Sequence, residues 1–295
     1  MILRWLRCWC VVVLCVVGLS LPAAMEMPDY DPARHDRFYA GGGADPALRE
    51  AWDWSGVALS TGGRWGTLVS SSFILSADHW APGVGAQMVF YPDNTGSGAV
   101  TLSVDAGWRV GNTDLWLGHL SSAAPSSLAR YAVCGDLGAG FLGTEIAVFG
   151  RDDAGGTTSQ RIGRNVIDQV GVADVRFVAE PVLVFDYDRV GSEVWPDEQR
   201  LVSGDSGGPE FARIGDSYSL VGINYFYYTD ALKQPAGSGG SLVTASIAAI
   251  NDLMRPYGEQ LVVVPEPCGG VLLLVGAALL GLCRPGRARR PAASA

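Results

Sequence analysis

The chain has 295 residues, of which 48% are hydrophobic and 17% charged, and its formal net charge at pH 7 is −9. The part between the two ends is more acidic still, because six of the 21 basic residues are arginines near the termini. So acidic a domain is repelled by the phosphates of nucleic acids and by anionic lipid surfaces, which excludes nucleic acid as a partner.

Three scattered histidines and one cysteine outside the ends, Cys134, lack metal-ligand spacing, so we expect no metal and no cofactor. Cys134 also leaves no intrachain disulfide, and we expect it to be buried and inert.

The N-terminus has the pattern of a secretory signal peptide. Within residues 1–24, two arginines precede an apolar run at 8–19, and small residues follow it. The sequence therefore predicts removal by a signal peptidase and export across the inner membrane. Residues 25–50, rich in Asp, Pro and Gly, are expected to form an N-terminal arm.

The middle of the chain alternates short β-prone runs with glycine-rich breaks such as PDNTGSG, RDDAGG and QPAGSGG. This spacing is typical of an all-β barrel or sandwich. The expected strands lie at 65–77, 86–92, 115–120, 144–150, 175–187 and 219–228.

One helix is expected late in the chain, at 244–256. Ile247, Ile250 and Met254 fall on one face there, and Pro256 marks its end.

His79 lies at the end of the apolar run FILSADH. A lone histidine more often has a structural role. The polar break after this run, however, puts the imidazole at the end of a strand and not inside one, which makes His79 a candidate for chemistry.

The motif GDSGGP at 204–209 places Ser206 among glycines and also satisfies G-x-S-x-G, the nucleophile elbow of α/β-hydrolases. That fold has its histidine after the serine, whereas His35, His79 and His119 all precede Ser206. The α/β-hydrolase fold is therefore excluded. The order that remains is histidine, aspartate, serine.

Several aspartates lie between His79 and Ser206. Asp114 in GNTDLWLGHL precedes an apolar run, and an acid at the start of a strand can be buried beneath a histidine. The aspartates of RDDAGG lie in an expected turn. Asp114 is therefore the preferred third member, and Asp105 is the second choice.

These segments resemble the trypsin/chymotrypsin-like serine proteases. SSSFILSADHW is similar to the family's strand ending in Thr/Ser-Ala-Ala-His-Cys, with Asp78 and Trp80 as departures, and GNTDLWLGHL is similar to its Asn-Asp-Ile-Ala-Leu-Leu-x-Leu pattern. The resemblance covers roughly residues 51–258. It implies two six-stranded antiparallel β-barrels of chymotrypsin type with a C-terminal helix, and a catalytic triad.

The resemblance also assigns roles around the serine. The N–H groups of Gly204 and Ser206 would form an oxyanion hole. Asp205 matches the family's aspartate that pairs with an N-terminal amine released by activation cleavage. No Arg-Ile-Val-Gly-Gly site is present, and the nearest comparable region is 52–60. The partner of Asp205 and the existence of a zymogen stay open.

Two further elements bear on substrate. In LVGINYFYY, Tyr225, Phe226 and Tyr227 would line the substrate in place of the family's Ser-Trp-Gly. Arg200, six residues before Ser206, would lie at the base of the specificity pocket and disfavour cleavage after Lys or Arg. The alternative for Arg200 is a solvated surface charge.

The C-terminal segment, 259–295, carries Pro-Glu-Pro, an apolar stretch at 268–283 and an arginine cluster. This tail resembles a PEP-CTERM sorting signal, which implies a bacterial envelope protein processed by an exosortase. Sixteen helical residues span roughly 24 Å, short of a hydrocarbon core of about 30 Å. We expect transient or permanent membrane association, with the arginines cytoplasmic before processing. The alternative is an ordinary single-span anchor.

Two functions follow as hypotheses. The first is an exported serine endopeptidase that acts on polypeptides through His79, Asp114 and Ser206 and an acyl-enzyme. The second is a catalytically inactive binding module of the cell envelope that keeps the protease fold. Loss of turnover on replacing Ser206 would discriminate them.

Overall fold

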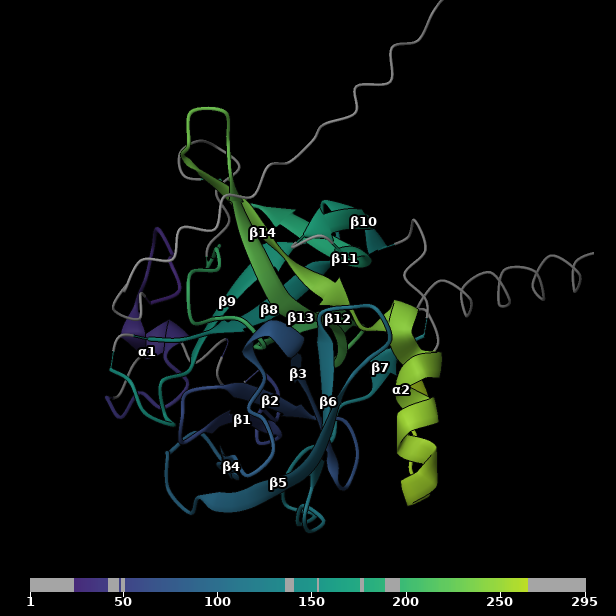
Figure 1. Cartoon of the computed structure of the whole chain (residues 1–295). Coiled ribbons are helices and arrows are strands. Elements are labelled where there is room, and N and C mark those ends of the chain that lie inside the picture. The colour runs from purple at the N-terminus through teal and green to yellow at the C-terminus, as the bar shows by residue number, and fades with distance from the viewer. Residues whose placement is uncertain are drawn as a thin grey trace, which may run out of the picture.

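The computed structural model describes residues 24–41, 48, 51–135, 141–152, 154–175, 178–188 and 197–264. The regular structure of the described residues is mostly β-strand, arranged as a closed barrel below and a second sheet above it in the view of Figure 1. The expected all-β class is confirmed at this level.

The first barrel closes six antiparallel strands in the order β1-β2-β3-β6-β5-β4. Its strands are short and mostly buried, and all five residues of β3 face the interior or the junction with the second sheet. The strands are β1 (Val57–Ser60), β2 (Trp65–Leu68), β3 (Phe73–Ala77), β4 (Gln87–Phe90), β5 (Val100–Arg109) and β6 (Leu115–Leu120).

The second sheet contains nine strands, not the six expected for this half. Its main path runs β10-β11-β14-β13-β12-β8-β9, and two short strands, β7 and β15, are added in parallel to each other, with β7 also beside β13. The strands are β7 (Val133–Cys134), β8 (Glu145–Gly150), β9 (Arg161–Val166), β10 (Gln169–Val175), β11 (Val178–Asp186), β12 (Pro209–Ile214), β13 (Ser217–Thr229), β14 (Pro235–Leu242) and β15 (Val263–Val264).

Strand β14 corrects the expectation of a break at QPAGSGG. It lies between β11 and β13 in the sheet, with Gly239 opposite Phe226. A Cβ on Gly239 would lie 2.6 Å from the Phe226 ring, and one on Gly240 would lie 2.2 Å from the Glu210 carboxylate. Only glycine fits at these positions, because the side chains of neighbouring strands fill the space above them. From composition alone, such a run of glycines is mistaken for a turn.

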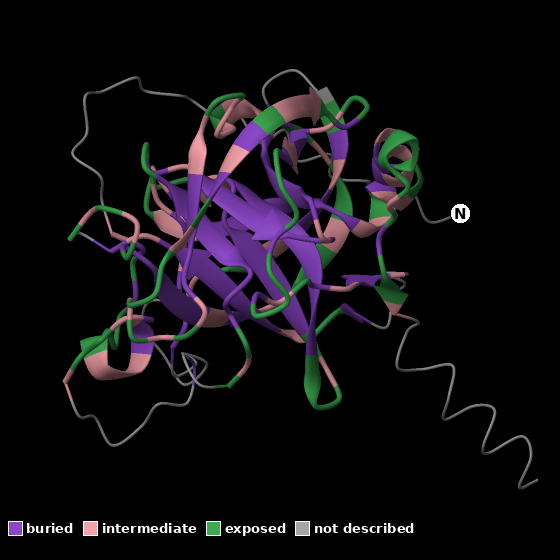
Figure 2. Cartoon of the chain, turned by 90° about the horizontal axis from the view of Figure 1, so that it is seen from below, coloured by how far each residue is buried: buried purple, intermediate pink, exposed green. Residues whose placement is uncertain are grey.

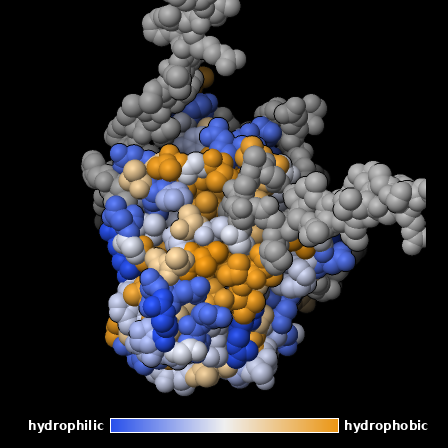
Figure 3. Space-filling model, turned by 90° about the vertical axis from the view of Figure 1, so that its right-hand side faces the viewer, coloured by the Kyte–Doolittle hydropathy of each residue, from blue (hydrophilic) through white to orange (hydrophobic). Residues whose placement is uncertain are grey.

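The helices are α1 (Pro32–His35) and α2 (Ile247–Met254), with 3₁₀ turns at Asp78–Trp80, Thr244–Ser246 and Arg255–Tyr257. Helix α2 and its flanking turns confirm the expected late helix, which ends at Gly258 with φ +74°. On the side of the molecule that carries α2, apolar side chains gather at the surface (Figure 3), and the exposed ones in this part of the chain are Tyr257, Val262 and Val263.

An aromatic cluster joins the two halves. Trp54 packs against Phe149 and Phe211 with ring centroids 5.2 and 5.4 Å apart, and all three side chains are fully buried. Buried strands fill the centre of the molecule while exposed loops surround them (Figure 2). Burial of such rings is a large favourable term, so this cluster fixes one half against the other.

The N-terminal segment is tied into both halves through Arg37, which is fully buried. Its guanidinium donates to the carbonyls of Val57 (3.1 Å) and Tyr91 (3.1 Å) in the first half, and to Oε1 of Gln160 (2.8 Å) in the second. The contacts of residues 24–41 and 259–264 thus extend the folded unit on both sides of 51–258.

We predict that Arg37→Met lowers the free energy of unfolding by about 3 kcal/mol, because three buried acceptors lose their donors. Urea denaturation measures this directly. Arg213→Met, at an exposed arginine on β12, is the matched control and should change stability by no more than about 0.5 kcal/mol. Equal effects at the two positions would contradict the bridging role of Arg37.

Candidate active site

Strand pairing brings His79 and Asp114 together. His79 lies in the 3₁₀ turn that directly follows β3, and Asp114 directly precedes β6. Strands β3 and β6 are antiparallel neighbours with Ala77 opposite Leu115, so the end of one meets the start of the other. The backbone N–H of Asp78 also donates to the Asp114 carbonyl, which closes the junction.

The Asp114 carboxylate binds His79 at two points. One oxygen accepts the backbone N–H of His79 at 3.0 Å, and the other lies 2.5 Å from Nδ1 of the imidazole. Asp114 is buried and the His79 ring is mostly buried. A carboxylate only accepts, so Nδ1 carries the proton and Nε2 presents its lone pair.

Ser206 contacts the other nitrogen of the His79 ring. It precedes β12, and its Oγ lies 2.9 Å from Nε2 of His79. The second-choice acid, Asp105, instead contacts Nδ1 of His119 at 2.6 Å. Asp114 is therefore the carboxylate that lies against His79.

The turn on both sides of Ser206 requires glycine. Gly204 has φ +106° and Gly207 has φ +90°, both in the left-handed region that other residues rarely adopt. A Cβ on Gly207 would also lie 2.6 Å from Oγ of Ser76. Among the hydrogen bonds of the described residues, none uses the N–H of Gly204 or of Ser206, the two expected oxyanion-hole donors.

Asp205 finds its partners in the backbone. Its two oxygens accept the N–H groups of Arg151 at 2.7 Å and Val202 at 2.8 Å. Burial raises the pKa of Asp205 to about 7, against the effect of these two donors and the nearby Arg151 and Arg161 charges. Asp205 thus fixes the loop before Ser206 to the end of β8, which answers the question that the sequence left open about its partner.

The N-terminal segment lies close to Asp205. Met25 is buried and donates its N–H to the Arg151 carbonyl, at 2.8 Å. Glu26 pairs with Arg200 through the backbone and through a carboxylate–guanidinium contact. Arg200 is therefore held by Glu26, a contact between residues 174 apart in the chain that the sequence did not reveal.

The expected substrate-lining residues lie on β13, and Tyr225 is the one whose ring contacts the imidazole. Tyr225 is buried, with its ring centroid 5.5 Å from that of His79, and its hydroxyl donates to the Val175 carbonyl. Phe226 is half-buried, and Tyr227 is exposed with its ring 5.9 Å from the Arg200 guanidinium. Tyr225 thus forms one wall beside His79, and Tyr227 stands at the surface.

Sequence reasoning missed two buried acids, Glu180 and Glu210. Glu180, on β11, accepts the backbone N–H of Asp114 at 2.8 Å and the Ser241 hydroxyl at 3.2 Å. Burial, and next the Asp114 charge, raise the pKa of Glu180 to about 7. The available signal was an acid within the apolar run VRFVAEPVLVFDY, where a buried strand has no solvent to receive it.

Glu210, on β12, is fully buried, and neither carboxyl oxygen has a hydrogen-bond partner among the described residues. It fills the space beneath Gly222 and Gly240, where added Cβ atoms would lie 1.9 and 2.2 Å from it. Burial raises the pKa of Glu210 well above its ordinary value, because the neutral form of the carboxyl is favoured where water is excluded.

We predict that the folding stability of the wild type falls as pH rises, and that Glu210→Met removes this dependence. A carboxyl whose folded pKa is raised stabilises the fold most below its ordinary pKa, and that contribution is lost as pH rises toward the raised value. Wild-type stability relative to the variant should therefore fall by about 1.4 kcal/mol per pH unit over that range. Urea denaturation from pH 5 to 9 measures the difference, with Glu145→Met at a partly exposed glutamate as control. Parallel curves for wild type and Glu210→Met would contradict the burial of a neutral acid.

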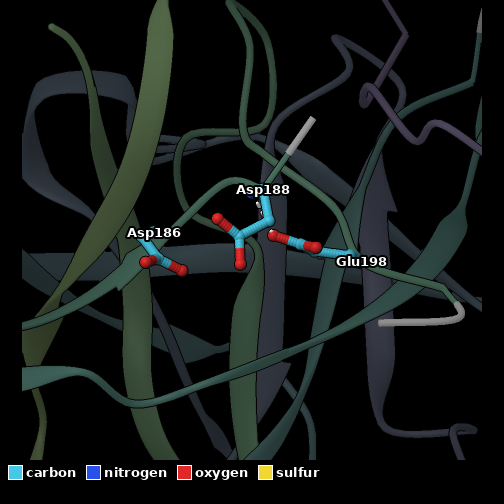
Figure 4. Close-up of side chains that lie close together, drawn as sticks. All are labelled: Asp186, Asp188 and Glu198. Atoms are coloured by element: carbon cyan, nitrogen blue, oxygen red, sulfur yellow. Dashed lines mark hydrogen bonds between the residues drawn. The ribbon is translucent and has the colours of Figure 1, made fainter. Parts of the chain in front are cut away.

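Three further acidic side chains lie close to one another at and after the end of β11 and at Glu198. The carboxylates of Asp186, Asp188 and Glu198 each offer an oxygen within 4.8 Å of the others. Figure 4 shows the Asp188 carboxylate between the other two. Burial, together with the charges of Asp168 and Asp188, raises the pKa of Asp186 to about 6. Oxygen ligands of this kind suit a hard cation, but clusters of acidic side chains are also common in proteins without a bound ion.

Comparison of this chain with protein-family models finds no match, and comparison with curated proteins finds none either. No helix among the described residues combines the length and apolar character that a membrane crossing requires. The expected signal peptide, apart from Ala24, and the expected sorting helix at 268–283 lie outside the described residues. Cys134, on β7, is buried, and it forms no disulfide within the part of the chain that the structure describes.

Proposed function

We propose that this protein is an exported serine endopeptidase with a chymotrypsin-like arrangement of two β-barrels. The observation that carries the proposal is the continuous contact from Asp114 through His79 to Ser206, with 2.5 Å at Nδ1 and 2.9 Å at Nε2. Three residues far apart in the chain meet in the order of proton transfer, and a triad is recognised by such roles.

In the proposed reaction, Ser206 Oγ attacks the carbonyl carbon of a peptide bond while its proton passes to His79 Nε2. Asp114 holds the ring in the required tautomer and stabilises the imidazolium. The resulting oxyanion accepts the N–H groups of Gly204 and Ser206, each typically worth about 3 kcal/mol of transition-state stabilisation.

The tetrahedral intermediate then collapses. The C–N bond breaks as His79 Nε2 gives its proton to the leaving amine, which leaves an ester on Ser206. Water attacks this ester, its proton passes to His79, and Ser206 regains a proton as the acid product departs. No cofactor or metal enters the proposed steps.

Processing by a signal peptidase at the N-terminus and by an exosortase at the C-terminus remains part of the proposal, as does envelope localisation. Both rest on sequence pattern alone. The strong acidity of the middle of the chain supports a polypeptide substrate over a nucleic acid.

The test is cleavage of a mixed peptide library, read by mass spectrometry of new termini. Wild-type protein should generate new termini and Ser206→Ala should not. A protein that binds peptides equally well before and after the substitution, without cleaving them, would support the inactive binding module instead.

A further inference from the structure

Glu180 reaches from the second sheet into the first barrel. It belongs to β11, and its fully buried carboxyl accepts the N–H of Asp114, 66 positions earlier in the chain. The same oxygen, Oε2, accepts the hydroxyl of Ser241 on β14. Oε1 has no partner among the described residues. The acid that lies against His79 is therefore anchored by a second acid from the other half.

The contact with Glu180 holds Asp114, whose carboxylate has to meet two groups of His79 at once. Asp114 joins the turn at residues 110–114 to β6, and its carboxylate must meet both His79 N and His79 Nδ1. The Glu180 contact fixes the Asp114 backbone, and through it the direction of the carboxylate. A hydrogen bond to an ionised acceptor is about twice as strong as a neutral one.

The charges around Glu180 determine what its ionisation does. Asp114 is the nearest negative group, and Arg109 on β5 supplies an opposing positive charge while also lying 3.6 Å from Asp78. Ser241 on β14 contributes a neutral donor. Ionised Glu180 therefore adds negative charge next to Asp114, whose own carboxylate lies against the imidazole. Positive charge that develops on His79 is stabilised by it.

We propose that Glu180 is a positioning residue for the triad, which anchors the Asp114 backbone and, when ionised, stabilises the His79 imidazolium formed as Ser206 attacks. This inference rests on the proposed function. Because burial raises the pKa of Glu180 to about 7, ionisation occurs within the working range of a histidine base. Turnover should then rise with pH beyond what the imidazole alone provides.

The test is Glu180→Gln, whose amide oxygen can still accept from Asp114 N–H and from Ser241 while the charge is lost. We expect kcat equal to wild type at pH 5.5 and about tenfold lower at pH 9, with KM unchanged. Glu145→Gln is the same change at the first residue of β8. The ratio of its kcat to the wild-type kcat should be 1 at both pH values. A ratio independent of pH would overturn the proposal, since a merely structural residue would act equally at both.

A second measurement does not need turnover. The Nδ1–H proton of His79 should give the same NMR resonance in wild type and Glu180→Gln at pH 5, where Glu180 is protonated. The two should differ at pH 9, and Glu145→Gln should match wild type at both. Coincident spectra at pH 9 in folded protein would overturn the inference for Glu180. If no protein cleaves peptide while the resonances differ as expected, the proposed function fails and the anchoring of Asp114 stands.

Discussion

Asp114→Asn should lower kcat by about 10⁴ while the protein stays folded. An amide at this position can still accept the backbone N–H of His79 through its oxygen, at the present 3.0 Å. Its NH₂ group then faces Nδ1, where a carboxylate oxygen now lies at 2.5 Å. The imidazole must accept at Nδ1 and carry its proton on Nε2, so no lone pair faces Ser206.

The chain provides a matched control for this change. Asp105 forms the same kind of contact with a histidine, His119, at 2.6 Å, but away from Ser206. Asp105→Asn should leave kcat within about twofold of wild type, since it affects no group near the reacting atoms. A comparable loss in both variants, measured as steady-state turnover of one peptide, would mean that Asp114 has no special place in the chemistry.

His79→Ala and Ser206→Ala should each lower kcat by about 10⁶, and the double variant should lose little more. The reason is that nucleophile and base act as one unit, so removing either abolishes the same proton transfer. Residual turnover would come from the N–H groups of Gly204 and Ser206 and from substrate binding. Single-turnover kinetics with enzyme in excess measures rates this low.

Additive losses of kcat in the double variant would contradict this account. If the double variant lost about 10⁶ beyond either single variant, His79 and Ser206 would be acting in separate steps. The 2.9 Å contact between Nε2 and Oγ would then be incidental to catalysis.

Much of the fold and the three central side chains could be predicted because the evidence for them is local. An apolar run that ends in a polar break marks the end of β3 and so the position of His79. Chain order excluded one fold for Ser206, and the strand-like run after Asp114 favoured it over Asp105. The contacts at Nδ1 and Nε2 agree with those choices.

What could not be predicted depends on contacts between distant residues. Nothing near Glu180 in the sequence indicates that its carboxyl meets the Asp114 backbone, and nothing near Arg200 indicates Glu26. The residue type was visible at each position, but the partner was set by how β11 and the N-terminal segment pack. Strand β14 was missed for a related reason, since its glycines serve neighbouring side chains and not a turn.

The partner of Asp205 is a further case. The resemblance implied a positively charged N-terminal amine as its partner, whereas the structure supplies two backbone N–H groups, from Arg151 and Val202. Sequence patterns record side chains, and a site built from backbone donors leaves little trace in them.

The measurement that tests the central claim most directly is labelling of the purified full chain with a biotinylated fluorophosphonate, followed by mapping of the labelled peptide. A serine hydroxyl reacts with this reagent only when a base takes its proton. The account predicts one label on Ser206, absent in His79→Ala and retained in Asp105→Asn. A folded wild-type protein that takes no label at Ser206, or takes it equally without His79, would contradict an assembled and activated nucleophile.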